Sequence, residues 1–152
     1  MKARTIALTV AVCFVGLTLC FSSPMMGTWK LNEAKSKFGP GAPKNNTVVY
    51  EASGDNIKIT VDGVDAEGKP THNEWTGKFD GKDYPVTGDA WSDSRSYKKV
   101  NGNTLDSTNK KEGKPTLHAH IVVSADGKTR TVTLHGSVNG KKITETAVYD
   151  KQ

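Results

Sequence analysis

Three residues near the C-terminus, Arg130, Glu145 and Tyr149, could bind a charged ligand group. If Asn139-Gly140 forms a two-residue hairpin loop, Arg130 faces Tyr149 across the two strands, and Glu145 lies on the same face. The rest of that face is apolar, with Val132, Leu134, Ile143 and Ala147. Because a buried charge without a partner is costly, we predict that Arg130 and Tyr149 orient a polar or anionic ligand group, with Glu145 deeper in the interior.

A second interpretation of the same residues involves no ligand. Arg130 would lie in water at the open rim of the fold, and Glu145 would be bonded to a core partner or solvated beside a bulge. Small barrels usually fill their interiors with side chains, which favours this second interpretation. The sequence leaves both interpretations open.

A metal site is the other chemistry that the residue pattern suggests. His118 and His120 lie on one strand face, and a two-residue Asp126-Gly127 loop would place His135 directly across from His118. Three imidazoles within reach of one another could hold zinc with an open fourth position. A three-residue bulged loop would instead shift the register and separate them. We favour solvent-facing histidines, because the other face of this strand is more apolar and no acidic residue is evident to orient the imidazoles.

Sequence signatures of enzymes are absent from the chain. It contains no Gly-x-Ser-x-Gly, no His-Glu-x-x-His and no phosphate-binding loop. Its cysteines, Cys13 and Cys20, both precede the mature chain that we infer below, which excludes a disulfide or a thiolate nucleophile there. We therefore expect a protein with no enzymatic activity and no cofactor.

Strands must position these residues, because nearly everything after Lys44 alternates apolar and polar residues with a period of two. Seven two-residue turn signals predict a meander of eight or nine strands, and we expect eight to ten strands in the whole barrel. The signals are Gly54-Asp55, Glu67-Gly68, Asp80-Gly81, Asn101-Gly102, Glu112-Gly113, Asp126-Gly127 and Asn139-Gly140. One short helix is predicted over Asn32 to Phe38.

The first hairpin specifies its own register. With Gly54-Asp55 as a two-residue loop, Tyr50 faces Ile59 on one side of the sheet, and Glu51 meets Lys58 as an opposite-charge pair on the other. A slip by one residue would destroy both matches.

Aromatic residues in the middle of the chain are predicted to lie in the interior. Around Asp80-Gly81 the register pairs Trp75 with Val86 and sets Tyr84 over Gly77. We expect Trp75 and Tyr84 to line any ligand cavity. Trp91, in a polar run, could fold over the mouth of a barrel or cap the edge of the core.

The two ends of the chain resemble a known group of barrels. Gly27-Thr28-Trp29-Lys30-Leu31-Asn32 is similar to the opening strand of lipocalins and fatty-acid-binding proteins, whose Gly-x-Trp plugs the closed end with its indole. Thr146-Ala147-Val148-Tyr149-Asp150-Lys151 resembles the closing strand of the fatty-acid-binding branch. The chain also resembles short exported lipocalin-like (calycin) proteins of bacteria. The resemblance implies an antiparallel meander closed into a barrel, whereas the alternation alone also fits a sandwich.

Two departures limit what the resemblance implies. The arginine that grips the ligand carboxylate in the fatty-acid binders, two positions before the closing tyrosine, is Ala147 here. The helix-turn-helix lid of that branch is missing, because only residues 32–46 separate the first two strands. The resemblance therefore implies the fold and a ligand cavity, and it does not imply fatty-acid binding.

The first 22 residues are typical of a secretory signal peptide. Lys2 and Arg4 precede a long uncharged run, and Cys20 and Ser22 supply the small residues that signal peptidase needs for a cut after Ser22. The 17-residue apolar run is short for a membrane anchor, which needs about 20 residues. A lipoprotein anchored at Cys20 is the less favoured alternative, because a leucine precedes that cysteine where lipoproteins carry a small residue.

Removal of residues 1–22 leaves residues 23–152 as one lipocalin-like barrel domain. The loss of Lys2 and Arg4 lowers 21 basic residues to 19 against 16 acidic ones, so the charge falls from +5 to +3. The remaining excess is dispersed, which argues against a nucleic-acid partner.

We expect a monomer, exported to the periplasm or the medium and without a membrane span, that binds a small apolar or amphipathic ligand. The alternatives are a structural or interaction protein with a filled barrel, or weak metal binding through the histidines.

Overall fold

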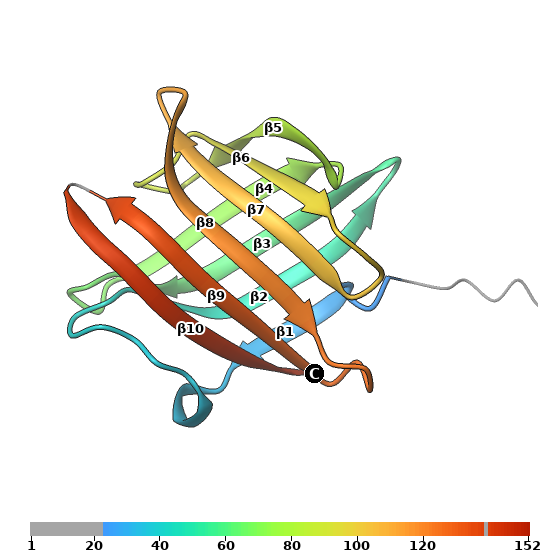
Figure 1. Ribbon diagram of the computed structural model, residues 1–152, viewed down its shortest axis with the longest axis horizontal. Helices are drawn as coiled ribbons and strands as arrows, with labels where there is room; N and C mark the ends of the chain where they lie inside the picture. Colours follow the sequence, from blue (N-terminus) through green and yellow to red (C-terminus); the bar gives the residue numbers. More distant parts are fainter. Residues whose placement is uncertain (1–22, 139) are drawn as a thin grey trace, which may run out of the picture.

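The computed structural model describes residues 23–138 and 140–152. Within them, ten antiparallel strands follow one another and close into a barrel, because β1 pairs with both β2 and β10 (Figure 1). The strands are β1 (Gly27–Leu31), β2 (Lys44–Ser53), β3 (Asn56–Val64), β4 (Pro70–Gly77), β5 (Asp80–Thr87), β6 (Ser94–Lys99), β7 (Thr104–Lys111), β8 (Lys114–Val123), β9 (Thr129–Val138) and β10 (Lys141–Lys151). The expected closed meander is confirmed, and the sandwich is excluded.

Several expectations concern residues outside the described part of the chain. These are the signal peptide, the cut after Ser22, the possible anchor at Cys20, and the residue Asn139 of the last hairpin loop. Within residues 23–138 and 140–152, no helix is both long enough and apolar enough to cross a membrane.

The hairpin registers agree with those predicted from the turn signals. Glu51 pairs with Lys58 between β2 and β3, and Arg130 pairs with Tyr149 between β9 and β10. His118 pairs with His135, so the connection between β8 and β9 keeps the register of a two-residue loop. These agreements follow from the period of two, which allows only one register to bury the apolar face of each strand.

The short helix after the first strand is present only as one turn of 3-10 helix, η1 (Glu33–Lys35). Asn32 caps this turn, because its Oδ1 accepts a hydrogen bond from the Lys35 backbone N–H at 3.2 Å. The chain then straightens, since Lys37 exchanges backbone hydrogen bonds with Thr146 of β10. That pairing ends the helix well before the predicted limit at Phe38.

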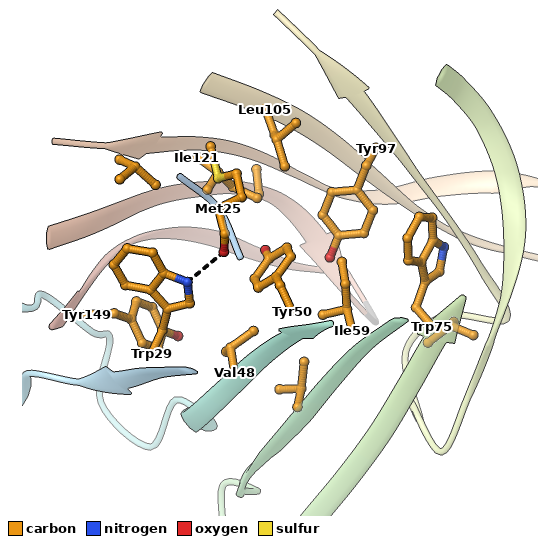
Figure 2. Packing of buried hydrophobic residues seen from close by; sticks show 14 residues of the cluster. Met25, Trp29, Val48, Tyr50, Ile59, Trp75, Tyr97, Leu105, Ile121 and Tyr149 are labelled. Atoms are coloured by element: carbon orange, nitrogen blue, oxygen red, sulfur yellow. Dashed lines mark hydrogen bonds between the residues drawn. The ribbon is translucent and has the colours of Figure 1, made fainter. Parts of the chain in front are cut away.

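Successive hairpin loops lie at opposite ends of the barrel, as in any up-and-down meander. One end, where β10 finishes, is filled by the segment before β1 together with Trp29. The indole of Trp29 is 0% exposed, and its Nε1–H donates to the backbone oxygen of Met25 at 2.8 Å (Figure 2). We call this the closed end, and the opposite end, which carries the β3–β4, β5–β6 and β9–β10 loops, the open end.

An aromatic cluster packs one wall of the interior. The Trp75 ring stacks on Phe79 and meets Tyr97 and Tyr84 edge to face. Tyr84 can lie so close only because residue 77 is glycine: a Cβ there would stand 2.5 Å from the Tyr84 ring. The predicted placement of an aromatic ring over Gly77 is therefore confirmed.

Candidate functional site: an interior cavity with two arginines

The barrel contains a cavity of about 240 Å3 that reaches the open end. Its apolar lining comes from the inward faces of β2, β3, β8, β9 and β10 and from the loops, with Val48, Val61, Val64, Leu117, Ala119, Ile121, Val132, Leu134 and Ile143 among the residues. Its polar lining includes Asn73, Asp89, Arg95, Ser107, Asn109, Arg130, Glu145 and Tyr149. The space is therefore amphipathic, and two cationic side chains enter it.

Arg130 lies at the floor of this cavity and is 5% exposed. It occupies the second position of β9, next to Tyr149 near the end of β10 and to Val123 at the end of β8, all toward the closed end. Its guanidinium carbon lies 4.8 Å from the centroid of the Tyr149 ring and 5.1 Å from that of Tyr50. The cation is thus held between two aromatic rings, which attract it through their electron-rich faces.

The depths predicted for Arg130 and Glu145 are wrong in both interpretations. β9 runs from the closed end to the open end, so Arg130 at its start is deep, and no solvated rim lies there. β10 runs the opposite way, so Glu145 is nearer the open end than Tyr149. The hairpin register fixes which residues face each other but not which end of the barrel is closed.

The guanidinium of Arg130 has unused hydrogen-bond donors. Its Nε and Nη1 are buried without a hydrogen-bond partner in the described part of the chain. None of the ion pairs among the described residues involves it. Because arginine stays protonated in proteins, the cavity floor carries a full positive charge that no carboxylate neutralises.

Two phenols surround this charge. Burial raises the pKa of Tyr50 and of Tyr149 above the usual value for tyrosine, although the Arg130 charge works in the opposite direction. Both hydroxyls are therefore neutral at physiological pH, and the Tyr50 hydroxyl is buried without a partner among the described residues. Arg130, which lines the cavity between these neutral phenols, offers its free donors to an anion.

The second interior arginine, Arg95 of β6, lies near the open end and is 7% exposed. In contrast to Arg130, it has a carboxylate partner: its Nη2 donates to Asp89 Oδ2 at 2.8 Å. Asp89 also accepts hydrogen bonds from the Trp91 backbone N–H at 2.9 Å and from Ser92 Oγ at 2.5 Å. This one carboxylate organises the β5–β6 loop, residues 88–93, and sets Trp91 on the cavity, as the first alternative for Trp91 predicted.

Asn73 of β4 lies beside this loop. Gly88 has a φ of +78°, and a Cβ there would stand 2.2 Å from the His72 carbonyl oxygen and 3.3 Å from the Asn73 Cα. Only glycine allows this approach. The Oδ1 of Asn73, which lines the cavity, is buried and has no partner in residues 23–138 and 140–152.

Glu145 is half-buried in the cavity wall. Burial raises the pKa of its carboxyl, while a hydrogen bond from the Gly39 backbone N–H and the charge of Lys141 act to lower it. Its position opposite Leu134 was predicted correctly. It therefore adds a titratable group between the open end and the Arg130 charge.

Comparison with known proteins identifies no relative. No family model matches the chain, and no curated protein matches it significantly. The architecture is consistent with a calycin-like barrel, because the meander is closed and its first and last strands pair.

Trp75 and Tyr84, predicted to line the cavity, do not do so. Trp75 is enclosed by Phe79, Tyr84 and Tyr97 and donates its Nε1–H to the Arg95 carbonyl at 2.8 Å. The Tyr84 hydroxyl is bonded to Asp80 at 3.0 Å. Trp75 belongs to the packed wall, because Tyr97 from β6, which lines the cavity, packs against it at 4.7 Å between ring centroids.

The predicted histidine site does not form a metal centre. The His118 and His135 rings stack with centroids 5.4 Å apart, whereas His120 Nδ1 lies 2.7 Å from Asp106 Oδ1. Within the residues that the structure describes, no group of three or more histidine, cysteine or acidic side chains is arranged to hold a metal ion. The imidazoles lie on the outer face, opposite the buried Ala119 and Ile121, as favoured from the sequence.

The sequence analysis did not select Arg95, Asp89 and Asn73, which line the cavity, or Tyr50, which packs against the Arg130 guanidinium. One signal was available, since Arg95 and Tyr97 are two residues apart and must share a face of β6. That strand offers no aliphatic residue to show which face is inward. The site residue of β6 could therefore not be assigned from its own strand. Asn73 could have been, because it lies two residues before Trp75 and shares the face of β4 that was predicted to be inward.

Proposed function

We propose that this protein is an exported, non-enzymatic binding protein that takes up a small amphipathic molecule and holds its anionic group at Arg130. The observation that carries the proposal is the guanidinium at the floor of the cavity, whose Nε and Nη1 have no partner among the residues that the structure describes. A buried cation with free donors lowers stability unless an anion meets it. A role in binding a ligand therefore explains an arginine at this position better than a role in packing does.

The size and lining of the cavity favour a compact ligand. A volume of about 240 Å3 is below the roughly 300–1,000 Å3 of pockets for drug-sized molecules. The valine, leucine and isoleucine side chains of the wall match a short apolar body. A short carboxylate or sulfonate meets these conditions, and a long-chain fatty acid does not.

Export is the second part of the proposal and is supported by residues 1–22, with their basic start and apolar run. Kinship with lipocalin-like proteins is supported by Gly27 to Asn32 and by the closing strand. N-terminal sequencing of protein recovered from the periplasm or the medium should begin at Ser23. An N-terminus at Met1, or an acylated Cys20, would contradict this part.

Calorimetric titration tests the binding site directly. Hexanoate and hexanesulfonate should bind the purified protein, and hexanol, which lacks the charge, should bind at least about tenfold more weakly. Arg130→Met should remove the preference for the two anions. Lys142→Met, which deletes an exposed charge from the same hairpin, is the matched control and should bind like wild type. Equal anion affinity in wild type and Arg130→Met would refute the proposal.

A further inference from the structure

Unpartnered polar atoms lie at two separate places around the cavity. In the described part of the chain, the buried side-chain atoms without a partner are Tyr50 OH, Asn73 Oδ1, Arg95 Nε, and Arg130 Nε and Nη1. The Arg130 atoms belong to the floor, and Tyr50 packs against that guanidinium without lining the cavity itself. The Asn73 and Arg95 atoms lie near the open end, where Asp89 and Trp91 form the rim. Because folded proteins leave few such atoms unpaired, their gathering around one cavity indicates a ligand with polar groups at both ends.

The charges at the two places differ. The floor is cationic, because Arg130 has no carboxylate partner among the described residues. The upper site is balanced, because Asp89 already neutralises Arg95. Two further acidic residues, Asp65 and Glu145, line the cavity toward the open end. A second anionic group on the ligand would therefore meet three carboxylates and only one arginine that is already paired.

The upper atoms require a neutral group with both hydrogen-bonding roles. Arg95 Nε is a donor and needs an acceptor, and Asn73 Oδ1 is an acceptor and needs a donor. A hydroxyl supplies both. An unsubstituted alkyl chain would cover the two atoms and leave each without a partner, which costs the full desolvation of the buried group.

We infer that the ligand is a short monoanion that carries a hydroxyl, or an equivalent neutral donor and acceptor, at the end opposite its charged group. This inference rests on the proposed function and specifies its ligand class. Arg130 binds the anionic end, Asn73 and Arg95 bind the hydroxyl, and the aliphatic side chains between them enclose the chain.

A panel of matched compounds tests the inference. Each member is an ω-hydroxy monocarboxylate of about four to eight carbons, compared with the plain monocarboxylate and the dicarboxylate of the same length. In calorimetric titrations, the best hydroxy acid should bind about tenfold more tightly than the plain acid, as one well-placed hydrogen bond in a buried site allows. The dicarboxylate should bind more weakly than the hydroxy acid.

Two asparagines of the cavity wall provide the variant and its control. Asn73→Leu removes the unpartnered oxygen, and it should abolish the preference for the hydroxy acid while retaining affinity for the plain acid. Asn109→Leu makes the same change on β7, where the side-chain oxygen is not among the unpartnered atoms, and it should keep the preference. In wild type, the Asn73 side-chain amide signals in NMR spectra should shift with the hydroxy acid and not with the plain acid, a readout that needs no substitution.

The outcomes separate the two proposals. Equal affinity for plain and hydroxylated acids in wild type overturns the inference and leaves anion binding at Arg130 intact. A preference that survives Asn73→Leu, or Asn73 signals that ignore the hydroxyl, also overturns it. Failure of every anion in the panel to bind overturns both.

Discussion

The closed end of the barrel and the cavity beside it both bury large side chains that carry polar atoms. They differ in whether those atoms have hydrogen-bond partners. At the closed end, Trp29 is completely buried and its N–H donates to Met25 (Figure 2). At the cavity floor, Arg130 is almost as deeply buried, and two of its nitrogens have no partner in the described chain. Burial alone therefore does not distinguish the packed part of the molecule from the candidate site, whereas unpaired polarity does.

The two arginines repeat this contrast within the cavity itself. Arg95 has Asp89 as a partner and helps to hold the β5–β6 loop. The Arg130 guanidinium lies against the Tyr50 and Tyr149 rings and forms no ion pair with the residues that the structure describes. We infer that Arg95 contributes to the stability of the fold, whereas Arg130 lowers that stability and serves ligand binding.

The largest loss of stability is expected for a substitution at the closed end. Trp29→Ala removes a fully buried indole and should lower the free energy of unfolding by about 3–5 kcal/mol. Urea denaturation followed by circular dichroism measures this. Trp91→Ala, at the half-buried rim of the cavity, is the control, and it should lower the free energy of unfolding by less than half as much. Similar losses for both would show that the rim is packed as tightly as the closed end.

The two arginines should respond oppositely to the same substitution. Arg95→Met leaves the Asp89 carboxylate without its cation and should destabilise the protein by about 3 kcal/mol, at the lower end for broken buried pairs because Asp89 keeps some exposure. Arg130→Met removes an unpaired charge and should leave stability within about 1 kcal/mol of wild type, or raise it. Denaturant unfolding of both variants compares them, and an equal loss in each would contradict the contrast.

A smaller effect, on the pH dependence of stability and of anion binding, is expected at Glu145. Its pKa is raised mainly by burial, so the folded protein binds this proton more tightly than the unfolded chain does. The stabilisation that comes from the protonated Glu145 carboxyl is then fully present below pH 4.5, and it is lost as the pH rises through the pKa of the folded state. The ionised carboxylate also repels an anionic ligand, so hexanesulfonate, which stays charged throughout, should bind a few-fold more tightly near pH 4.5 than at pH 8.

Glu145→Gln provides the test of that assignment. The variant should bind hexanesulfonate with nearly the same affinity at both pH values, as measured by calorimetry. A pH dependence as large as that of wild type would assign the effect to other groups.

The smallest effect is expected on the outer face. His120→Ala should leave zinc binding unchanged from wild type and weak in both, because His120 is bonded to Asp106 and no ligand set of three converges there in the described residues. Calorimetric zinc titration measures this. Tight binding that the substitution abolishes would restore the metal site predicted from the sequence.

Local patterns in the sequence determined the strands and their pairing. Turn dipeptides and the period of two were enough to place Glu51 against Lys58 and Arg130 against Tyr149, because these partners are close in sequence and one register alone buries the apolar face. The same patterns placed Arg130, Glu145 and Tyr149 on the inner face. They also left the sandwich as an alternative, which only the pairing of β1 with β10 excludes.

The tertiary structure decided how deep each site residue lies in the barrel and which side chains line the same cavity. Arg130 became the floor of a cavity because the Trp29 end is the one that is filled. The lipocalin resemblance of Gly27 to Asn32 implied that end, but no hairpin register contains it. Asn73 and Arg95 come from different strands and line the same cavity, whereas Trp75 packs against Tyr97 and does not line it. Such placements depend on which side chains from non-adjacent strands fill the interior, and packing in three dimensions determines that.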